Sequence, residues 1–292
     1  MRKTTLLSVL GASVIVVAVV FSAIILAFNS GDEAGRVVVY AAPTLAGVVE
    51  DAARAYGPDR VDIRSLGSVL AVKLIQAGRT PDVLMSVDWE LLKMINARKI
   101  LDLGFFRLHF VCTGNYSVSD IGRVRVGVAN PNIAPIGYRA LAALYWLSVK
   151  HNLLSLDEVS NYLNITYDYD QASNRVVIDA REFHARGRFI ARDDLAGVGA
   201  LLEGGAVDCI FSHTPFIISR KYAERFRAFD MPAEIDFSED PPINFTVIVE
   251  SGEIDVKAFR AFAASFTSSG DELLMTMSRL DFSKYGLLMR NG

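Results

Sequence analysis

The spacing of hydrophobic positions alternates between two periods after residue 35. Short apolar runs rich in Val are typical of strands buried on both faces, and each is followed by a segment with helical spacing. This alternation predicts parallel strands joined by crossover helices, and therefore an α/β fold. The predicted strands span 36–43, 60–67 and 81–88, and the predicted helices span 44–57, 68–78 and 89–100.

The pattern after residue 100 predicts a second α/β unit. A long extended segment comes first, and the second unit itself opens at 123–130 and continues through a mixed region, 164–192, of alternating stretches. The extended segment and further strands are predicted at 101–114, 123–130, 207–212 and 241–250, with helices at 137–152, 195–205 and within 256–280.

Two such units predict two lobes with a ligand cleft between them. We expect the chain to leave the first lobe near Gly114 and to return near Pro241. The first lobe would then contain residues 36–114 and 241–292, and the second lobe residues 115–240. Ligands in such folds bind outside the carboxyl ends of strands, near helix N-termini.

The first 30 residues carry the strongest hydrophobic signal. Arg2 and Lys3 precede an uncharged run, 4–30, and roughly 20 apolar residues suffice for a helix to cross a bilayer. The apolar core of a cleaved signal is usually shorter, roughly 7–15 residues. We expect residues 1–30 to be an uncleaved transmembrane signal anchor and residues 31–35 a linker. A cleaved signal is the alternative, and both place the domain outside the cell.

Three strand-to-helix corners could bind an anion. Helix N-termini carry unpaired N–H groups and roughly half a positive charge, so corners at Thr44 and Ser68 could hold a small oxyanion without Lys or Arg. The alternative is that both are ordinary N-caps. The third corner, NPNIAPIGYR at 130–139, could present backbone N–H groups, with Ala134 and Ile136 as candidates. Its alternative is a loop that only starts a helix.

These segments resemble the archaeal-type tungstate/molybdate-binding proteins of ABC importers. The resemblance covers roughly residues 36–250 and rests on VVVYAAPTLAG, LGSVLAVKLIQAG, NPNIAPIGYRAL and ALLEGGAVDCIFS. It implies a two-lobed periplasmic-binding-protein fold in which the hydroxyls of Thr44 and Ser68 contact the oxyanion. It also implies an ABC permease and its ATPase as partners.

Three positions depart from that family. Its members place an Asp and a Glu where this chain has Ala134 and Ser212, and those carboxylates complete an octahedral shell around the metal. We therefore expect no metal coordination by carboxylates here. A tetrahedral oxyanion would be held by hydrogen bonds alone, with Ser212 as a donor. Pro43 also removes the N–H of a family glycine.

Composition and charge exclude several classes of function. Hydrophobic residues make up 51% of the chain, which supports a buried core rather than disorder. The net charge is only -3 and Lys and Arg do not cluster, which argues against nucleic-acid binding. No P-loop, nucleophile elbow, HExxH or paired-Cys zinc signature is present. We expect neither an enzyme nor a cofactor.

Five further side chains have a structural interpretation, and for all of them except Asp88 a second interpretation stays open. His213 either donates to the anion or is a structural histidine. Arg139 either clamps the anion or pairs with a structural carboxylate. Asp88 would repel an anion, so we interpret it as a cap or a hinge partner. Cys112 and Cys209 form either one disulfide or two small buried hydrophobic residues.

The sequence thus predicts a membrane-anchored extracellular receptor, monomeric, that captures tungstate or molybdate for an ABC importer. One alternative is a receptor of the same fold for another anion, such as sulfate or an organic acid. Another is an anchored interaction domain that has lost binding. Sequons at Asn115, Asn164 and Asn244 fit an external location.

Overall fold

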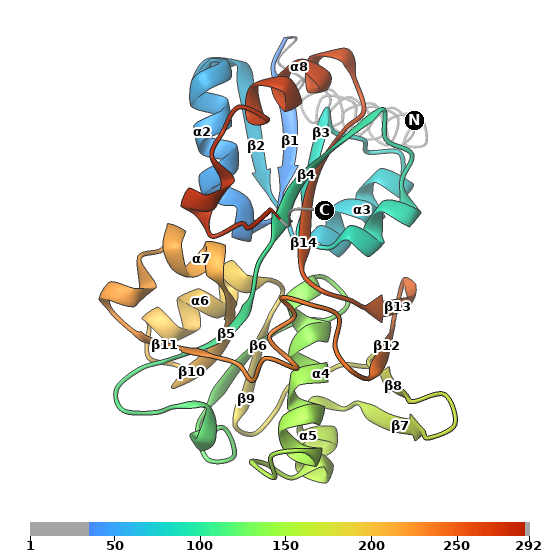
Figure 1. Cartoon of the computed structure of the whole chain (residues 1–292), viewed down its shortest axis with the longest axis vertical. Helices are drawn as coiled ribbons and strands as arrows, with labels where there is room; N and C mark the ends of the chain where they lie inside the picture. The colour runs from blue at the N-terminus through green and yellow to red at the C-terminus, as the bar shows by residue number, and fades with distance from the viewer. Residues whose placement is uncertain (1–34, 290–292) are drawn as a thin grey trace, which may run out of the picture. The chain divides into compact units, whose positions relative to one another are not determined.

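A computed structural model describes residues 35–289 and contains three β-sheets (Figure 1). Sheet A has the strand order β2-β1-β3-β14-β4. Its first three strands are parallel, and β14 runs antiparallel to both of its neighbours. The strands are β1 (Val37–Ala41), β2 (Val61–Ser65), β3 (Val83–Ser86), β4 (Lys99–Phe105) and β14 (Arg260–Ser265).

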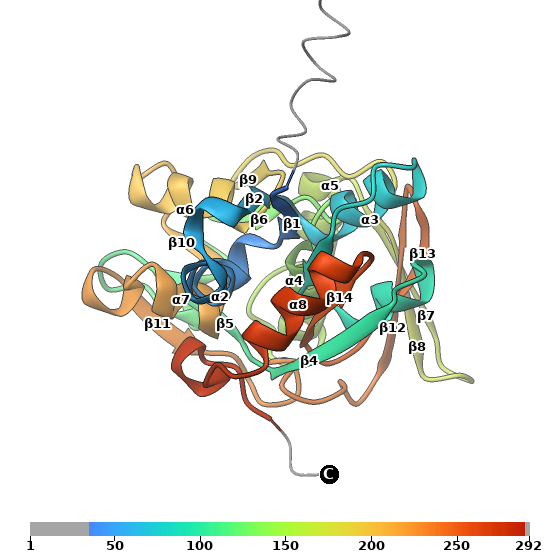
Figure 2. The ribbon, with the colours of Figure 1, turned by 90° about the horizontal axis from the view of Figure 1, so that it is seen from above.

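Helices cover sheet A with their apolar faces. The helix α2 buries Val48, Val49, Ala52 and Ala53 and ends at Gly57, whose φ of 130° favours glycine. It lies beside α8 (Figure 2). The helices of this lobe are α2 (Ala46–Tyr56), α3 (Ser68–Gln76) and α8 (Ser268–Met277), and the 3-10 turns are η1 (Pro43–Leu45), η2 (Pro58–Arg60), η3 (Trp89–Met94) and η6 (Phe282–Tyr285).

Sheet B has the strand order β11-β5-β10-β6-β9. Its strands are β5 (Leu108–Cys112), β6 (Val126–Ala129), β9 (Phe189–Arg192), β10 (Cys209–His213) and β11 (Arg227–Asp230). The accompanying helices and 3-10 turns are α6 (Leu195–Glu203), α7 (Thr214–Ser219), η4 (Val118–Asp120) and η5 (Tyr222–Glu224).

Sheet C has the order β13-β12-β8-β7 and adjoins the long helix α4. Because α4 is apolar on all sides, it is buried along almost its whole length. The strands are β7 (Thr166–Asp170), β8 (Arg175–Asp179), β12 (Asn244–Val249) and β13 (Gly252–Val256), and the helices are α4 (Pro135–Val149) and α5 (Leu156–Leu163).

The chain crosses between sheet A and the other sheets at two aromatic positions. Phe106 lies in the crossing from β4 to β5, and Phe259 in the crossing from β13 to β14. Their rings stack with centroids 4.7 Å apart, which places the two crossings side by side. We call sheet A with its helices the first lobe, and sheets B and C with theirs the second lobe.

β5, which follows the first crossing, and β12, which precedes the second crossing, both pair with strands of the second lobe. The sequence pattern places Leu108–Cys112 and Asn244–Val249 in the first lobe, within 36–114 and 241–292. The first of these strands pairs with β10 and the second with β8, both of which are distant in sequence. Local hydrophobic patterns carry no information on such long-range pairing.

The α/β class predicted from the sequence is confirmed, but two predicted helices are wrong. The segment predicted as a helix to residue 100 is a 3-10 turn, η3, followed by β4. The helices predicted from residue 256 contain β14, whose Ala-rich run lies buried between β3 and β4. Pairing on both edges overrides the helical preference of alanine there. The elements α5, β9, α7 and β11 were not predicted.

The predicted signal anchor at 1–30 and most of the linker lie outside the described residues. Between residues 35 and 289, no helix has the length and apolar character needed to cross a membrane.

Cys112 and Cys209 form a disulfide, one of the two interpretations that the sequence left open. They face each other in the antiparallel register of β5 and β10 and are completely buried. The bond closes a loop with a sequence separation of 97 residues.

Removal of this disulfide should lower the free energy of unfolding. A bond that closes a loop of this length restricts the unfolded chain, and typical losses are about 2–4 kcal/mol. We expect a decrease of that size for the Cys112→Ala/Cys209→Ala double variant in urea denaturation. Wild-type protein under a strong reductant is the control and should approach the variant. Equal stability of all three samples would contradict the prediction.

Candidate functional site

Helix starts from both lobes surround one small cavity. It lies at the carboxyl ends of parallel strands, where η1, α3, α4 and α6 begin. Its volume is about 10 Å³, roughly the room that one water molecule needs. A tetrahedral oxyanion therefore fits only if the lining groups separate. The lining residues are Ala42, Pro43, Thr44, Gly67, Ser68, Val87, Ala134, Pro135, Ile136, Asp194, Leu195 and His213.

Thr44 reaches across the cavity to the second lobe. Its Oγ1 lies 2.9 Å from Nδ1 of His213, and both side chains are buried. In one tautomer of the ring Thr44 donates this hydrogen bond, and in the other it accepts and keeps its proton for a ligand. The N-cap of α2 is Leu45, so the capping role predicted for Thr44 is wrong.

His213 is neutral and incompletely bonded. Burial holds the pKa of His213 well below its usual range, and Arg139 and His109 lower that pKa further. Its Nε2 has no hydrogen-bond partner among residues 35–289. Leaving such a buried group unsatisfied costs about 1–3 kcal/mol, which a ligand at this nitrogen would recover. The ring also contacts Phe106 and Phe259, so the cavity adjoins the two crossings.

Ser68 is the first residue of α3, after the N-cap Gly67. Its Oγ accepts a hydrogen bond from the N–H of Val87 at 3.3 Å, and its own proton can be donated to a ligand. The next two N–H groups of α3 donate to the carbonyl of Ile133, at 3.1 and 3.3 Å. A Cβ on Gly67 would lie only 2.7 Å from that oxygen, so glycine allows the close approach. The carbonyl of Ile133 in the second lobe therefore occupies two of the N–H groups at the start of α3 that were predicted to be available to an anion.

The loop before α4 is held by its own hydrogen bonds. The N–H of Ala134 donates to the carbonyl of Asn130 at 2.9 Å and is not free for a ligand. The side chain of Asn132 donates to the carbonyl of Ala180 and accepts from the N–H of Glu250. Ala134 and Ile136 nevertheless line the cavity, which agrees with the prediction that this strand-to-helix corner lies at the site.

The structure brings four of the five predicted site residues together and separates the fifth. Ser212 precedes His213 on β10, and successive side chains on a strand point to opposite faces. It does not line the cavity, and its buried Oγ has no hydrogen-bond partner in the described part of the chain.

Asp194 is a lining residue that the sequence analysis did not identify. It is the N-cap of α6, where its Oδ1 accepts a hydrogen bond from the N–H of Gly197 at 2.9 Å. The signal was present, since an Asp directly before an apolar helix is a typical start. Among the described residues that line the cavity none is Lys or Arg, so within residues 35–289 this carboxylate is the one lining group whose side chain ordinarily carries a charge at neutral pH.

Arg139 pairs with Asp88 and does not clamp a ligand. Both side chains are completely buried, and Nη1 of Arg139 donates to Oδ2 of Asp88 at 3.0 Å. The hydroxyl of Tyr138 donates to the same oxygen, while Oδ1 accepts from the N–H of Glu90. Arg139 also donates to the carbonyl of Lys257, next to the second crossing. This agrees with the structural interpretation of Arg139 and with the cap or hinge interpretation of Asp88.

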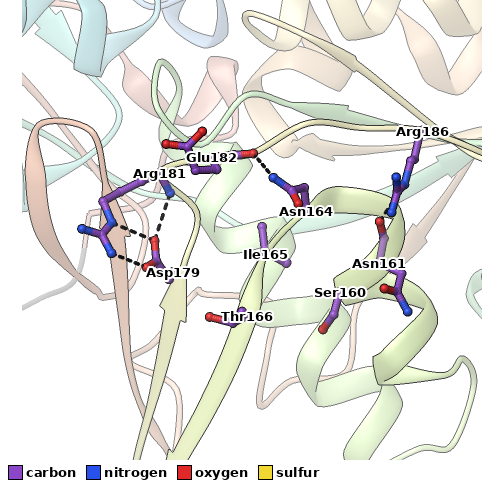
Figure 3. A pocket seen from close by; sticks show the side chains of 9 residues that line it. All are labelled: Ser160, Asn161, Asn164, Ile165, Thr166, Asp179, Arg181, Glu182 and Arg186. Atoms are coloured by element: carbon purple, nitrogen blue, oxygen red, sulfur yellow. Dashed lines mark hydrogen bonds and ion pairs between the residues drawn. The ribbon is translucent and has the colours of Figure 1, made fainter.

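A larger cavity, of about 740 Å³, lies on the second lobe (Figure 3). Its polar groups are largely bonded to each other. Arg181 turns toward Asp179, Asn164 donates to the carbonyl of Glu182, and Arg186 donates to a nearby carbonyl. None of the predicted site residues lines it.

Solved structures share this fold, although no protein-family model and no curated protein matches the sequence. The periplasmic molybdate-binding protein of Azotobacter vinelandii is similar with a TM-score of 0.61 and 15% identity, over 88% of this chain and 100% of that one. The L-phospholactate-bound PEB3 of Campylobacter jejuni has a TM-score of 0.52 and 12% identity, over 87% and 100%. The bromide-bound regulatory domain of HypT from Salmonella typhimurium has 0.51 and 14%, over 85% and 96%.

These likenesses establish the architecture of the chain. It has the mixed α/β fold with two lobes that characterises periplasmic binding proteins, as the sequence predicted. The candidate cavity lies between the lobes and is lined from both of them.

Replacement of Asp88 should destabilise the protein strongly. Asp88→Asn leaves the buried charge of Arg139 unpaired, and breaking such a pair costs about 3–5 kcal/mol. The matched control is Asp179→Asn, which removes the more exposed partner of Arg181 and should cost about 0–1 kcal/mol. Urea denaturation of both variants measures the difference, and similar losses in the two variants would contradict the structural role of the buried pair.

Proposed function

We propose that this protein is a solute-binding protein that captures a small oxyanion for an ABC-type importer. The observation that supports the proposal is the cavity between the lobes, where four helix starts and the hydroxyls of Thr44 and Ser68 meet. Helix N-termini favour negative charge, and hydroxyl donors add directional hydrogen bonds. In the tautomer in which Thr44 donates to Nδ1, His213 would instead supply the N–H of Nε2 from the second lobe.

Tungstate and molybdate are the first ligand candidates. The resemblance of the sequence implies them, and the Azotobacter vinelandii neighbour is a molybdate-binding protein. Two other structural neighbours are described with L-phospholactate or bromide, so anions recur among proteins of this fold. With Ala134 and Ser212 in place of the family carboxylates, hydrogen bonds would hold the oxyanion.

A different anion is the second candidate, and the position of Asp194 favours it. A carboxylate at the cavity repels a fully deprotonated dianion and accepts a hydrogen bond from a ligand that carries an O–H. The third possibility is a domain that has lost binding, which the small volume of the cavity would also fit. The ligand experiment below separates these three.

Capture would follow from hinge motion about the two crossings. The lobes would separate at Phe106 and Phe259, admit the anion, and close so that the second lobe completes the set of hydrogen bonds. The closed form would then dock on a permease as a monomer. The chain would act outside the cell, held by the predicted N-terminal anchor, and the buried disulfide fits an oxidising compartment.

Ligands of the native state should raise the melting temperature. Binding stabilises a protein by about 2.7 kcal/mol when the ligand is present at 100 times its Kd. We expect differential scanning to show an increase with at least one of tungstate, molybdate, sulfate and phosphate, and none with chloride at equal ionic strength. The absence of any increase, including with a panel of organic acids, would favour the domain without binding.

Removal of the Thr44 hydroxyl should weaken oxyanion binding. Thr44→Val keeps the shape of the side chain but loses a hydrogen bond to a charged ligand, worth about 1.5–3 kcal/mol, or roughly 10-fold to 100-fold in Kd. Thr44→Ser is the matched control because it keeps the hydroxyl. Isothermal titration of both variants with the anion that gives the largest thermal shift provides the measurement. Equal affinities in the two variants would exclude Thr44 from the site.

A further inference from the structure

We propose that Asp194 makes the cavity selective for an oxyanion that keeps a proton at neutral pH, of the hydrogen phosphate class. The inference rests on the proposed function, because it assigns the ligand of the same cavity. It develops the second ligand candidate and ranks it above tungstate and molybdate.

The charges around the cavity carry the argument. The lining contributed by residues 35–289 contains one carboxylate and no Lys or Arg, and the ring of His213 is neutral because burial lowers its pKa. The buried Arg139 is compensated by Asp88 at 3.0 Å, and so contributes little net attraction for an anion. A fully deprotonated dianion would face Asp194 with no cation in the lining to offset the repulsion.

The geometry of Asp194 leaves it able to accept a further hydrogen bond. As the N-cap of α6 it is held in place by the N–H of Gly197, which donates to Oδ1 at 2.9 Å. An ionised carboxylate has two oxygens and about four acceptor sites, so the cap uses only part of its capacity. A ligand O–H directed at Asp194 would turn the repulsive contact into a charge-assisted hydrogen bond.

The other lining groups supply hydrogen-bond donors to the ligand. Ser68 and one tautomer of the Thr44–His213 pair supply donors to the unprotonated oxygens of the ligand, while Asp194 accepts from its O–H. The completely buried ring of His213 also lines the cavity, and its Nε2 has no hydrogen-bond partner among residues 35–289, which is a second and independent sign of a site for a ligand. Phosphate retains at least one proton at neutral pH, whereas molybdate, tungstate and sulfate are fully deprotonated. Sites built to bond a ligand hydroxyl discriminate strongly against analogues that lack it.

The test compares two isosteric substitutions of neighbouring residues. Asp194→Asn keeps a helix-capping side chain but replaces the acceptor-only carboxylate by a neutral amide. Asp193→Asn changes the net charge equally, at an exposed residue outside the cavity lining. Both variants and the wild type are titrated calorimetrically with phosphate, molybdate, tungstate and sulfate at neutral pH.

We expect the wild type to bind phosphate about 10-fold or more tightly than the three deprotonated anions, the order of one charge-assisted hydrogen bond. Asp194→Asn should weaken phosphate binding and strengthen molybdate or sulfate binding by a similar factor, whereas Asp193→Asn should resemble the wild type. Tighter binding of molybdate, tungstate or sulfate by the wild type, with equal effects of the two substitutions, would overturn the inference and leave the receptor function standing. Failure of all three proteins to bind any of the four anions would overturn this inference, and the absence of binding to the panel of organic acids as well would overturn the proposed function.

Discussion

The buried pair of Asp88 and Arg139 is the interaction on which the rest of the structure depends. Asp88 follows β3 of the first lobe, whereas Arg139 lies in the second turn of α4 in the second lobe. Because neither charge is exposed, each requires the other and the surrounding donors and acceptors. The contact of Arg139 with the carbonyl of Lys257 extends this network to a crossing. It therefore links the two lobes beside a crossing about which they would rotate.

An anion site without a basic side chain makes a specific physical demand. Partial charges at helix starts and a few hydroxyl donors must replace a salt bridge, and they do so only where water is excluded and the donors converge. In the proposed function, Thr44 and Ser68 would meet that demand from the first lobe. The second lobe contributes His213, which also touches the aromatic residues of both crossings. A ligand at this ring would therefore act directly on the hinge.

Local sequence patterns predicted the first three strands and two of the first three helices, but they failed in two informative places. The Ala-rich run of β14 has helical preference, yet it forms a strand because β3 and β4 pair with its two edges. Asp194 was missed for a different reason. Its capping pattern is visible in the sequence, but nothing local shows that α6 begins at the same cavity as η1, α3 and α4. Ser212 was predicted to line the cavity but does not, because side chains alternate along β10 and that of His213 takes the side of the cavity.

The sequence by itself determined the α/β class, the strand-to-helix corners at Thr44 and Ser68, and a third such corner at the loop before α4. Each of these depends on short-range periodicity and turn chemistry. Only the tertiary structure decided which strands join sheets B and C and that Cys112 meets Cys209. It also decided that Asp194 and His213 face the cavity while Arg139 is occupied by Asp88. These outcomes depend on contacts between residues far apart in the chain, whose energies are set by burial and pairing rather than by neighbours in sequence.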